Sequence, residues 1–306
     1  MRTLIIHNPA SGHQGEDIFS FARSALRPSD EIVIRTTSES VDARDLLADA
    51  ASFDAVVASG GDGTVARVAY AVRDTGVPVL VFPSGTANLL ANNIGNAGEP
   101  AALAQTMRTG ARVSLDMGEI SYRDGHGVER SCGFLTMAGA GFDADIMRGS
   151  QPLKQTFGQF SYYLAALGSV NSPCSHLTME LDGQHVEADG ICVLAGVWGA
   201  VNPGIELIPG SDPQDGLIDL VIVKAARPVQ LLPVMLGAVF GQGIDESCVE
   251  VHRVRQATIS CDPPLPMQFD GEVIEGATTP FTVRVIPGGL TTFVDALSPL
   301  AKRADR

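Results

Sequence analysis

The chain has 306 residues, of which 45% are hydrophobic and 18% charged, so it is long enough for two domains with a sizeable core. Its formal net charge of −14 argues against a nucleic-acid-binding surface, which needs clustered Lys and Arg, and against purely electrostatic docking on an anionic membrane. The acidic charge does not exclude a nucleotide-binding site, because backbone N–H groups at a helix N-terminus bind phosphate without a basic surface.

The cysteines and the apolar segments indicate the compartment. The five cysteines are scattered and form no CxxC pair, which is typical of free thiols in a reducing compartment. The apolar run at residues 4–6 is too short for a signal peptide. The run at 229–240 contains Pro233 and is shorter than the roughly 20 residues of a membrane-spanning helix. We therefore expect a cytoplasmic protein.

The first third of the chain alternates strand and helix patterns. Short apolar runs predict strands at residues 3–6, 32–34, 55–58 and 77–82. Helical periodicity separates them at 18–26, 41–51 and 65–72, and another helix follows the last strand. Strands that alternate with helices form βαβ units, so we expect an α/β domain with a parallel sheet over residues 1–115.

The pattern changes near residue 113. Strand-like segments then follow one another without regular helices between them, at 117–122, 128–139, 176–183, 191–198, 217–223, 256–261 and 281–287. Turn signals such as Asp182-Gly183 separate them, and only two helical stretches interrupt, at 158–170 and 228–240. This pattern predicts an all-β sandwich domain over residues 116–287.

Residues 59–64, "SGGDGT", stand between a strand and a helix. The glycines allow a sharp turn and a close approach to a ligand, and the following helix directs its positive end to the same place, which suits a phosphate. Asp62 is the exception, because a carboxylate repels phosphate unless it holds Mg²⁺ or takes a proton from a hydroxyl. The alternative is an ordinary tight turn in which the aspartate caps the helix.

A second glycine loop, "FPSGTANLLANNIG" at residues 82–95, again follows a strand and begins a helix. Gly85, Thr86 and Asn88 would present donors at the carboxyl edge of the same sheet, where open α/β sheets bind ligands. The first strand ends in a similar turn, with Asn8 and Gly12. Three such turns on one edge predict a polyphosphate site, although Thr86 and Asn88 could instead cap the helix. Neither a Walker P-loop nor a GxGxxG fingerprint is present.

Six blocks in order resemble one family. They are "NPASG", "GGDGT", "PSGTAN", "AGAGFDA" (138–144), "PGSDPQDGLIDL" (209–220) and "FDGE" (269–272). Together they resemble the diacylglycerol kinase catalytic domain family, which includes bacterial diacylglycerol kinases and sphingosine and ceramide kinases. The resemblance implies a phosphofructokinase-like α/β domain and a C-terminal β-sandwich, with ATP in the cleft between them. It also implies that residues 288–306 return to the first domain.

The resemblance implies a set of nucleotide-contacting and metal-binding positions. The nucleotide positions are Asn8, Gly12, Thr37, Gly60, Gly61, Asp62, Gly63, Thr64 and Thr86, to which the chemistry of the second glycine loop adds Gly85 and Asn88. A Mg²⁺ site would use Asp212, Asp215 and Leu217, with Asp215 giving its side chain and the others backbone carbonyls. Oxygen ligands of this kind fit Mg²⁺. Without the resemblance, this Asp- and Gly-rich segment would be interpreted as a β-turn.

The resemblance also implies a proton acceptor for the lipid hydroxyl. We predict Glu272 in this role, with Asp270 and Asp62 as partners. Alternation along an extended segment would point Asp270 and Glu272 to the same side. The alternative is that Asp270-Gly271 is simply the turn of a β-hairpin.

The chain departs from the family pattern at several positions. Ala66 and Arg67 replace the usual Asn and Glu after "GGDGT", Leu89 replaces a common Asp, and Gln214 replaces the first Asp of the metal block. The favoured function is an ATP- and Mg²⁺-dependent lipid kinase with diacylglycerol as acceptor. NAD kinase, which shares "GGDGT", and a nucleotide-binding regulator that has lost kinase activity are the alternatives.

The expected partners follow from the same reasoning. A lipid kinase without a spanning helix would reach its substrate by peripheral contact with the inner face of the membrane. No nucleic-acid partner is expected, and a homodimer is left open.

Overall fold

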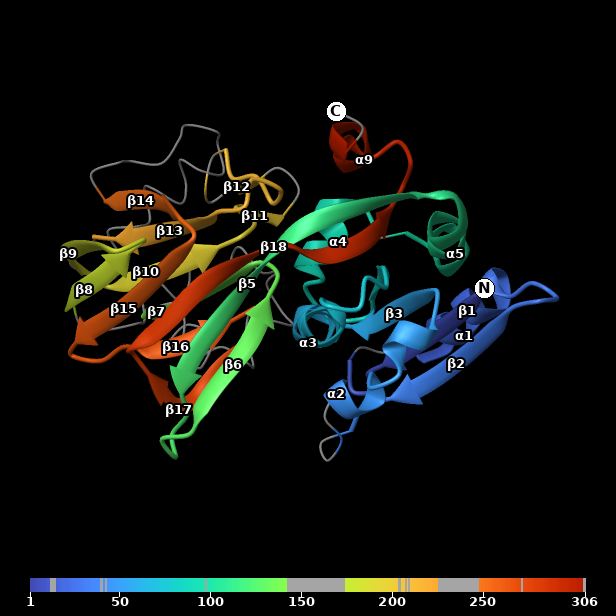
Figure 1. Ribbon diagram of the computed structural model, residues 1–306, viewed down its shortest axis with the longest axis horizontal. Helices are drawn as coiled ribbons and strands as arrows, with labels where there is room; N and C mark the ends of the chain where they lie inside the picture. Colours follow the sequence, from blue (N-terminus) through green and yellow to red (C-terminus); the bar gives the residue numbers. More distant parts are fainter. Residues whose placement is uncertain are drawn as a thin grey trace. The chain divides into compact units, whose positions relative to one another are not determined.

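The computed structural model describes residues 1–11, 15–38, 41, 43–96, 98–141, 174–202, 205–206, 208, 210–224, 248–270 and 272–304 (Figure 1). The chain divides into two compact units, Met1–Met117 with Pro287–Arg306, and Gly118–Ile286. The sequence predicted domain boundaries after residues 115 and 287. The first lies two residues before the observed boundary, and the second lies one residue after it. The helices predicted at 158–170 and 228–240 lie outside the described residues.

The first unit is built on a parallel sheet. Its strands run in the order β2-β1-β3-β4-β18, and their bounds are β1 Arg2–His7, β2 Glu31–Thr36, β3 Ala55–Gly60, β4 Val79–Pro83 and β18 Phe281–Val294. The end of β18 joins β4 in parallel, with Thr292 opposite Val79. All residues of β3 and nearly all of β1 are buried, as expected for parallel strands covered on both faces.

The helices of this unit follow the predicted alternation. They are α1 Gly15–Ala25, α2 Ala43–Leu46, the 3₁₀ turn η1 Ala50–Ser52, α3 Asp62–Val72, α4 Leu89–Ile94, α5 Pro100–Thr109 and α9 Pro299–Ala304. Phe21 of α1 packs edge-on against Phe82 of β4, with ring centres 5.5 Å apart, inside a core shared with α5. Edge-to-face packing of this kind is favourable for aromatic pairs.

One predicted helix is much shorter than expected. The sequence predicts a helix over residues 41–51, whereas α2 has four residues and a 3₁₀ turn follows. Arg35 of β2 explains the early end, because its Nη1 donates to the carbonyl of Leu46 at 2.6 Å and its guanidinium pairs with Asp49. A tertiary contact thus overrides local helix propensity.

The second unit is an antiparallel sandwich. Its strands are β5 Ala111–Arg123, which begins in the first unit, β6 Glu129–Phe134, β7 Met137–Gly141, β8 Ser175–Leu181, β9 Gln184–Gly190, β10 Cys192–Gly196, β11 Ala200–Asn202, β12 Ile205–Glu206, β13 Ile218–Val223, β14 Val249–Val254, β15 Gln256–Asp262, β16 Pro266–Phe269, β17 Glu272–Thr278 and the first part of β18. One layer has the order β14-β13-β10-β7-β16-β17, and the other contains β18, β15, β8 and β9 with β5 and β6.

A single hydrophobic core lies between these two layers. Leu177 and Ile259 reach it from one layer, and Val193, Leu220 and Met267 reach it from the other. Inward-facing residues alternate with exposed ones along β8, the pattern of a strand with one wet face. The predicted fold class, an α/β domain followed by an all-β sandwich, is confirmed.

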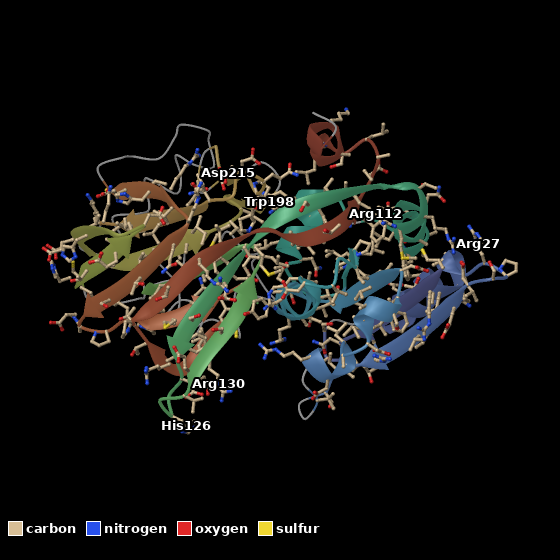
Figure 2. The ribbon with its side chains drawn as sticks, in the orientation of Figure 1. Arg27, Arg112, His126, Arg130, Trp198 and Asp215 are labelled. Atoms are coloured by element: carbon tan, nitrogen blue, oxygen red, sulfur yellow. The ribbon has the colours of Figure 1, made fainter. Side chains whose placement is uncertain are left out.

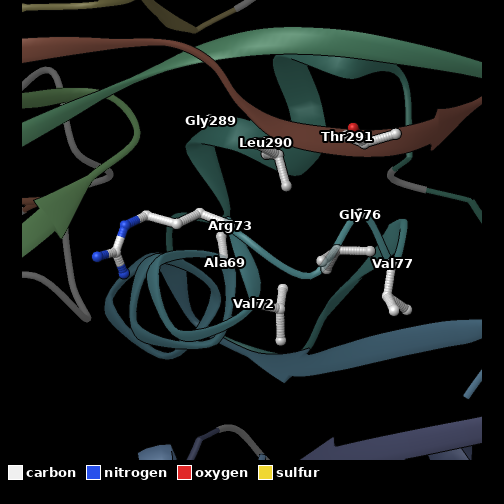
Figure 3. Close-up of a pocket in the computed structure, with 9 residues that line it drawn as sticks. Ala69, Val72, Arg73, Gly76, Val77, Gly289, Leu290 and Thr291 are labelled. Atoms are coloured by element: carbon white, nitrogen blue, oxygen red, sulfur yellow. The ribbon is translucent and has the colours of Figure 1, made fainter. Parts of the chain in front are cut away.

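A small pocket lies in the first unit, away from the predicted site residues (Figure 3). It is lined by the C-terminal part of α3, Gly76, and residues of β4 and β18. Arg73 extends away from it, with its guanidinium carbon 4.0 Å from the centre of the Tyr70 ring. Because Val79 begins β4 whereas the predicted loops follow the ends of strands, this pocket is at the opposite edge of the sheet.

No helix within the described part of the chain is both long and apolar enough to cross a lipid bilayer.

Candidate active site

Three polar loops meet at the carboxyl edge of the parallel sheet. The first loop (residues 8–11) follows β1, the second (60–64) follows β3, and the third (84–88) follows β4. The strands are in register at this edge, with His7 opposite Ser59 and Ser59 opposite Phe82. Backbone hydrogen bonds continue the pairing into the loops, from Asn8 N to the Ser59 carbonyl at 2.8 Å and from Ser84 N to the Gly60 carbonyl at 3.1 Å. The structure therefore brings together the three turns that the sequence singled out.

Side chains of the first loop bind the other two loops. Asn8 Nδ2 donates to Thr64 Oγ1 at 3.0 Å, and Asn8 Oδ1 accepts from Ala10 N at 3.0 Å. The hydroxyls of Ser11 and Ser84 lie 3.3 Å apart. Asn8 thus acts as a link between loops, while Gly12 lies outside the described residues.

One glycine, Gly85, lets the second and third loops touch, and another, Gly60, lets the second loop turn tightly onto Thr64. A Cβ added to Gly85 would lie 2.4 Å from the Cα of Gly61, well inside van der Waals contact. A Cβ added to Gly60 would lie 2.4 Å from Cβ of Thr64, which is itself buried. A residue larger than glycine at either position would force its neighbours to move. The two glycines therefore determine how closely the chain packs at this edge of the sheet.

The third loop is held by its own asparagine. Asn88 has a left-handed backbone (φ 49°, ψ 45°), and its side chain accepts from Gly85 N at 2.9 Å and donates to the Gly85 carbonyl at 2.7 Å. It makes no side-chain cap to α4. The Asn88 amide therefore shapes the loop, and the Thr86 side chain, in the same loop, is exposed.

Asp62 has a partner that sequence reasoning missed. Helix α3 begins at Asp62, three residues before the predicted start, so Asp62, Gly63 and Thr64 form its first turn. Asp62 Oδ1 accepts from Leu90 N at 3.2 Å, at the beginning of α4. Burial raises the pKa of the Asp62 carboxyl, and the backbone N–H groups of Leu89 and Leu90 oppose that rise. The carboxylate thus has a backbone partner at the start of α4 in addition to any cation or hydroxyl, and the prediction of those partners stays a prediction.

Two further residues lie at the same edge. Thr37 follows β2 and donates its backbone N–H to the His7 carbonyl at 2.9 Å, so it stands next to the first loop. His7 is buried, and its Nδ1 lies 3.0 Å from Ser59 Oγ. Burial lowers the pKa of His7, which favours a neutral ring at pH 7.

The predicted metal residues share one loop of the second unit. Asp212 Oδ1 accepts from Gln214 N at 3.2 Å, and Asp215 Oδ1 accepts from Leu217 N at 2.9 Å. Asp215 is exposed as a residue (Figure 2), but partial desolvation of its carboxyl raises its pKa, and the negative charges of Asp219 and Asp212 raise it further. Arg253 forms an ion pair with Asp219, one of these neighbouring carboxylates, and its Nε lies 3.1 Å from Asp219 Oδ1.

This loop fits a hard divalent cation by its chemistry. Carboxylates that raise one another's pKa are stabilised by a shared cation, and carbonyl and carboxylate oxygens are the donors that Mg²⁺ takes. Within the described ranges, no group of three or more His, Cys, Asp or Glu side chains is placed to hold a metal. A metal here would therefore depend on backbone carbonyls as well as on Asp215.

Asp270 is not placed as a base. Strand β16 ends at Phe269 and β17 begins at Glu272, which pairs with Phe269, so Asp270 belongs to a hairpin turn and not to an extended segment. Its backbone is left-handed (φ 43°) and its carboxylate accepts hydrogen bonds from residues 135–137. The prediction that Asp270 and Glu272 alternate along one strand was wrong. The backbone of Glu272 is described, whereas its side chain is not.

Comparison with protein families covers nearly all of the chain. Residues 2–120 match the diacylglycerol kinase catalytic domain, and residues 136–294 match the YegS C-terminal NAD kinase beta sandwich-like domain. The chain belongs to the diacylglycerol kinase family. It is accordingly a kinase, a phosphotransferase with an alcohol group as acceptor.

Individual relatives agree over their full length. A probable lipid kinase YegS-like from Pseudomonas fluorescens is 31% identical over 97% of this chain and 96% of its own. A diacylglycerol kinase from Mycobacterium tuberculosis is 28% identical, with 94% of each chain covered. The crystal structure of a putative diacylglycerol kinase from Bacillus anthracis superposes with a TM-score of 0.76 at 20% identity, over 97% of this chain and 98% of that one. The last match shows the same fold.

The departures from the family pattern occupy different environments. Ala66 is fully buried in α3, whereas Arg67 is exposed on the same helix. Leu89 and Gln214 are half-buried. Leu89 contributes to the carboxyl edge of the sheet through its backbone, since its N–H lowers the pKa of the Asp62 carboxyl.

Gly85→Ala tests the contact between the second and third loops. We expect the added Cβ to push the Gly85 loop away from Gly61 and to weaken nucleotide affinity by about tenfold or more, because small displacements of a binding loop are costly. Gly98→Ala is the control, since its Cβ would meet only Ala102 Cβ at an ordinary 3.6 Å. Titration calorimetry with ATP measures the effect, and equal affinities in both variants would contradict it.

Asp62→Asn tests the electrostatics of the second loop. An acid whose folded pKa is raised binds its proton more tightly in the folded state, so stability falls as pH rises above its ordinary value of 3.8. Asn stays neutral and can still accept from Leu90 N. We expect the variant to gain stability over wild type between about pH 4 and about pH 7, and a pH-independent difference in urea unfolding would contradict this.

Proposed function

We propose that this kinase transfers the γ-phosphoryl group of ATP to a lipid hydroxyl, with diacylglycerol as the acceptor. The observation that carries the proposal is the meeting of three hydroxyl- and glycine-rich loops at one sheet edge, bound to one another through Asn8, Thr64, Ser11 and Ser84. The names of the relatives, lipid kinase and diacylglycerol kinase, support a lipid acceptor.

The loops would hold phosphate through neutral donors. The first turn of α3 directs its backbone N–H groups and the positive end of an eleven-residue helix toward the second loop. Thr86 would add a hydroxyl from the third loop. Residues 8–11, 60–64 and 84–88 contain no Lys or Arg, so most of the charge of a triphosphate would have to be balanced from elsewhere.

Mg²⁺ would supply the positive charge that balances the triphosphate. We propose that Asp215 binds it through its side chain, and Asp212 and Leu217 through their carbonyl oxygens. When bound, the ion would neutralise negative charge on the transferring phosphoryl group. The Asp215 turn is already closed by the Leu217 N–H, so its backbone is preorganised.

The acceptor hydroxyl must lose a proton as it is phosphorylated. We propose that Glu272 takes it, with Asp62 as the alternative acceptor at the phosphate edge. Phosphoryl transfer has a loose transition state, so placing the hydroxyl matters more than the strength of the base. The raised pKa of Asp62 is compatible with proton uptake, although its hydrogen bond to Leu90 N also gives it a role in positioning.

The lipid would be reached by peripheral contact with the inner face of a membrane. A kinase of this type has to extract or approach a hydroxyl at the headgroup level, and the acidic chain makes apolar contact a better anchor than charge.

An acceptor screen tests the proposed reaction. Purified protein, Mg²⁺ and ATP labelled in its γ-phosphoryl group are offered diacylglycerol in mixed micelles, sphingosine, or NAD. We expect label in diacylglycerol. Label in NAD alone would overturn the lipid assignment, and nucleotide binding with no labelled acceptor would favour a regulator.

Glu272→Gln tests the proton acceptor within the same assay. We expect turnover to fall by about 100-fold or more with the fold intact, since general base catalysis is typically worth that much. Glu275→Gln is the matched control, because Glu275 is an exposed carboxylate in the same strand, β17. If both variants keep wild-type turnover, Glu272 is not the base, and Asp62→Asn then distinguishes the alternative.

Asp215→Asn tests the metal loop without measuring catalysis. Trp198 is the single tryptophan, and the next residue, Gly199, packs against Ile208 and Ser211 at the start of this loop. We expect saturable Mg²⁺-dependent fluorescence in the wild type and a midpoint shifted by about tenfold or more in the variant. Asp189→Asn, an exposed carboxylate on β9, should titrate like the wild type. Identical curves for Asp215→Asn would overturn the site.

A further inference from the structure

Asp270 occupies a turn that does not by itself require a carboxylate. Residues 270 and 271 connect Phe269 to Glu272, which are paired across β16 and β17. A two-residue hairpin turn of this kind needs a left-handed backbone, and Asp270 has φ 43°. Asn satisfies that requirement as well as Asp, so the turn conformation leaves the acid unexplained.

The carboxylate is explained by four donors from a second connection. Asp270 Oδ2 accepts from Leu135 N at 2.9 Å. Oδ1 accepts from Thr136 N at 2.9 Å, Thr136 Oγ1 at 2.6 Å and Met137 N at 3.2 Å. Only a group with two acceptor oxygens can serve these donors together, because the amide of Asn would point an N–H₂ at one of them. The Asp270 carboxylate therefore fixes the β16–β17 turn to residues 135–137, between β6 and the start of β7. These hydrogen bonds are called the Asp270 clamp.

The clamp is buried and reinforced by the backbone. Asp270 is 9% exposed and Thr136 is 1% exposed. Asp270 N donates to the Met137 carbonyl at 2.8 Å. Hydrogen bonds to an ionised acceptor are about twice as strong as neutral ones, and they gain strength where water is excluded.

The strand that follows Asp270 has little regular pairing beyond its first two residues. Among the strands that the structure describes, β17 is at the edge of its sheet and pairs with β16 alone. Its pairing with β16 is regular at Phe269–Glu272 and Gln268–Val273, and the register shifts between Gln268 and Pro266, which pairs with Thr278. An edge hairpin with so few regular pairs frays readily unless its turn is held.

A second Asp-Gly turn in the same unit serves as an internal comparison for the Asp270 turn. Asp182-Gly183 joins β8 to β9, with Asp182 at φ 48°. Its carboxylate accepts from Arg255 N at 3.1 Å and Gln256 N at 2.8 Å. Asp182 is exposed, and the residue two positions later is Gln184, where the other turn has Glu272.

We propose that Asp270 is a positioning residue of the kinase. Its carboxylate fixes the β16–β17 turn against Leu135, Thr136 and Met137, and so holds the backbone of Glu272 where its side chain can accept the proton. The inference rests on the proposed role of Glu272. Asp270 itself exchanges no proton with the substrate.

Asp270→Asn and Asp182→Asn form the first test. Each removes one carboxylate from an Asp-Gly sequence whose Asp has a left-handed φ. We expect Asp270→Asn to lower kcat by about 100-fold while KM for ATP changes less than about twofold, because a base displaced by about 1 Å loses that much rate. Asp182→Asn should keep kcat and lose only stability. Equal kcat in the two variants, measured where both are folded, would overturn the proposal.

Thr136 supplies a second test that does not depend on Asp270 variants folding. Thr136→Val removes the hydroxyl that donates to Asp270, and Thr136→Ser keeps it. We expect the Val variant to lose about tenfold in kcat and the Ser variant to recover most of it, since a hydrogen bond to a charged group is worth that order. If both variants match the wild type, the clamp does not act on the reaction.

Hydrogen exchange separates failure of the clamp from failure of the proposed base. We expect amide exchange in residues 266–278 to speed up in Asp270→Asn and in Thr136→Val, and to stay unchanged in Asp182→Asn. Faster exchange with an active Glu272→Gln would overturn the role of Glu272 and with it the positioning role. Unchanged exchange with an inactive Glu272→Gln would overturn the clamp alone.

Discussion

The close approach of Gly61 and Gly85 is the contact on which the candidate site depends. Strands β1, β3 and β4 end in register, so the loops that follow them must share one sheet edge. A side chain at Gly85 would meet the Gly61 backbone at 2.4 Å and would separate the second loop from the third. With no side chain at Gly85, the first turn of α3 and the loop carrying Thr86 lie together, and Asn8 joins the first loop to them.

Electrostatics at this edge come from the backbone more than from side chains. The three loops contain no Lys or Arg, and the chain as a whole is strongly acidic. Asp62 adds a negative charge, which the beginning of α4 stabilises through Leu90 N. Helix termini thus serve both the carboxylate of the protein and, in the proposed function, the phosphates of the nucleotide. A cation such as Mg²⁺ then carries the charge that neutral donors cannot balance.

The two Asp-Gly turns show how one local motif acquires different surroundings. Asp182 and Asp270 have nearly the same φ, and each is followed by a glycine in the sequence. One carboxylate is exposed and receives backbone N–H groups at the start of β15. The other is buried and receives four donors from one connection. Local sequence specifies the turn in both cases, and the neighbouring strands decide how firmly each turn is held.

The amino-acid sequence by itself determined the division into an α/β part and a β part, because strand and helix periodicities are local. It also singled out Asn8, Gly60, Gly61, Thr64 and Gly85, since glycines and polar residues between a buried strand and a helix have few other uses. Tertiary structure alone decided the partner of Asp62, the early end of α2 at the Arg35 contact, and the structural role of Asp270. Each depends on a hydrogen bond between residues that are distant in sequence, 28, 11 and 135 positions apart, and no local pattern encodes which distant donor or acceptor a side chain will meet.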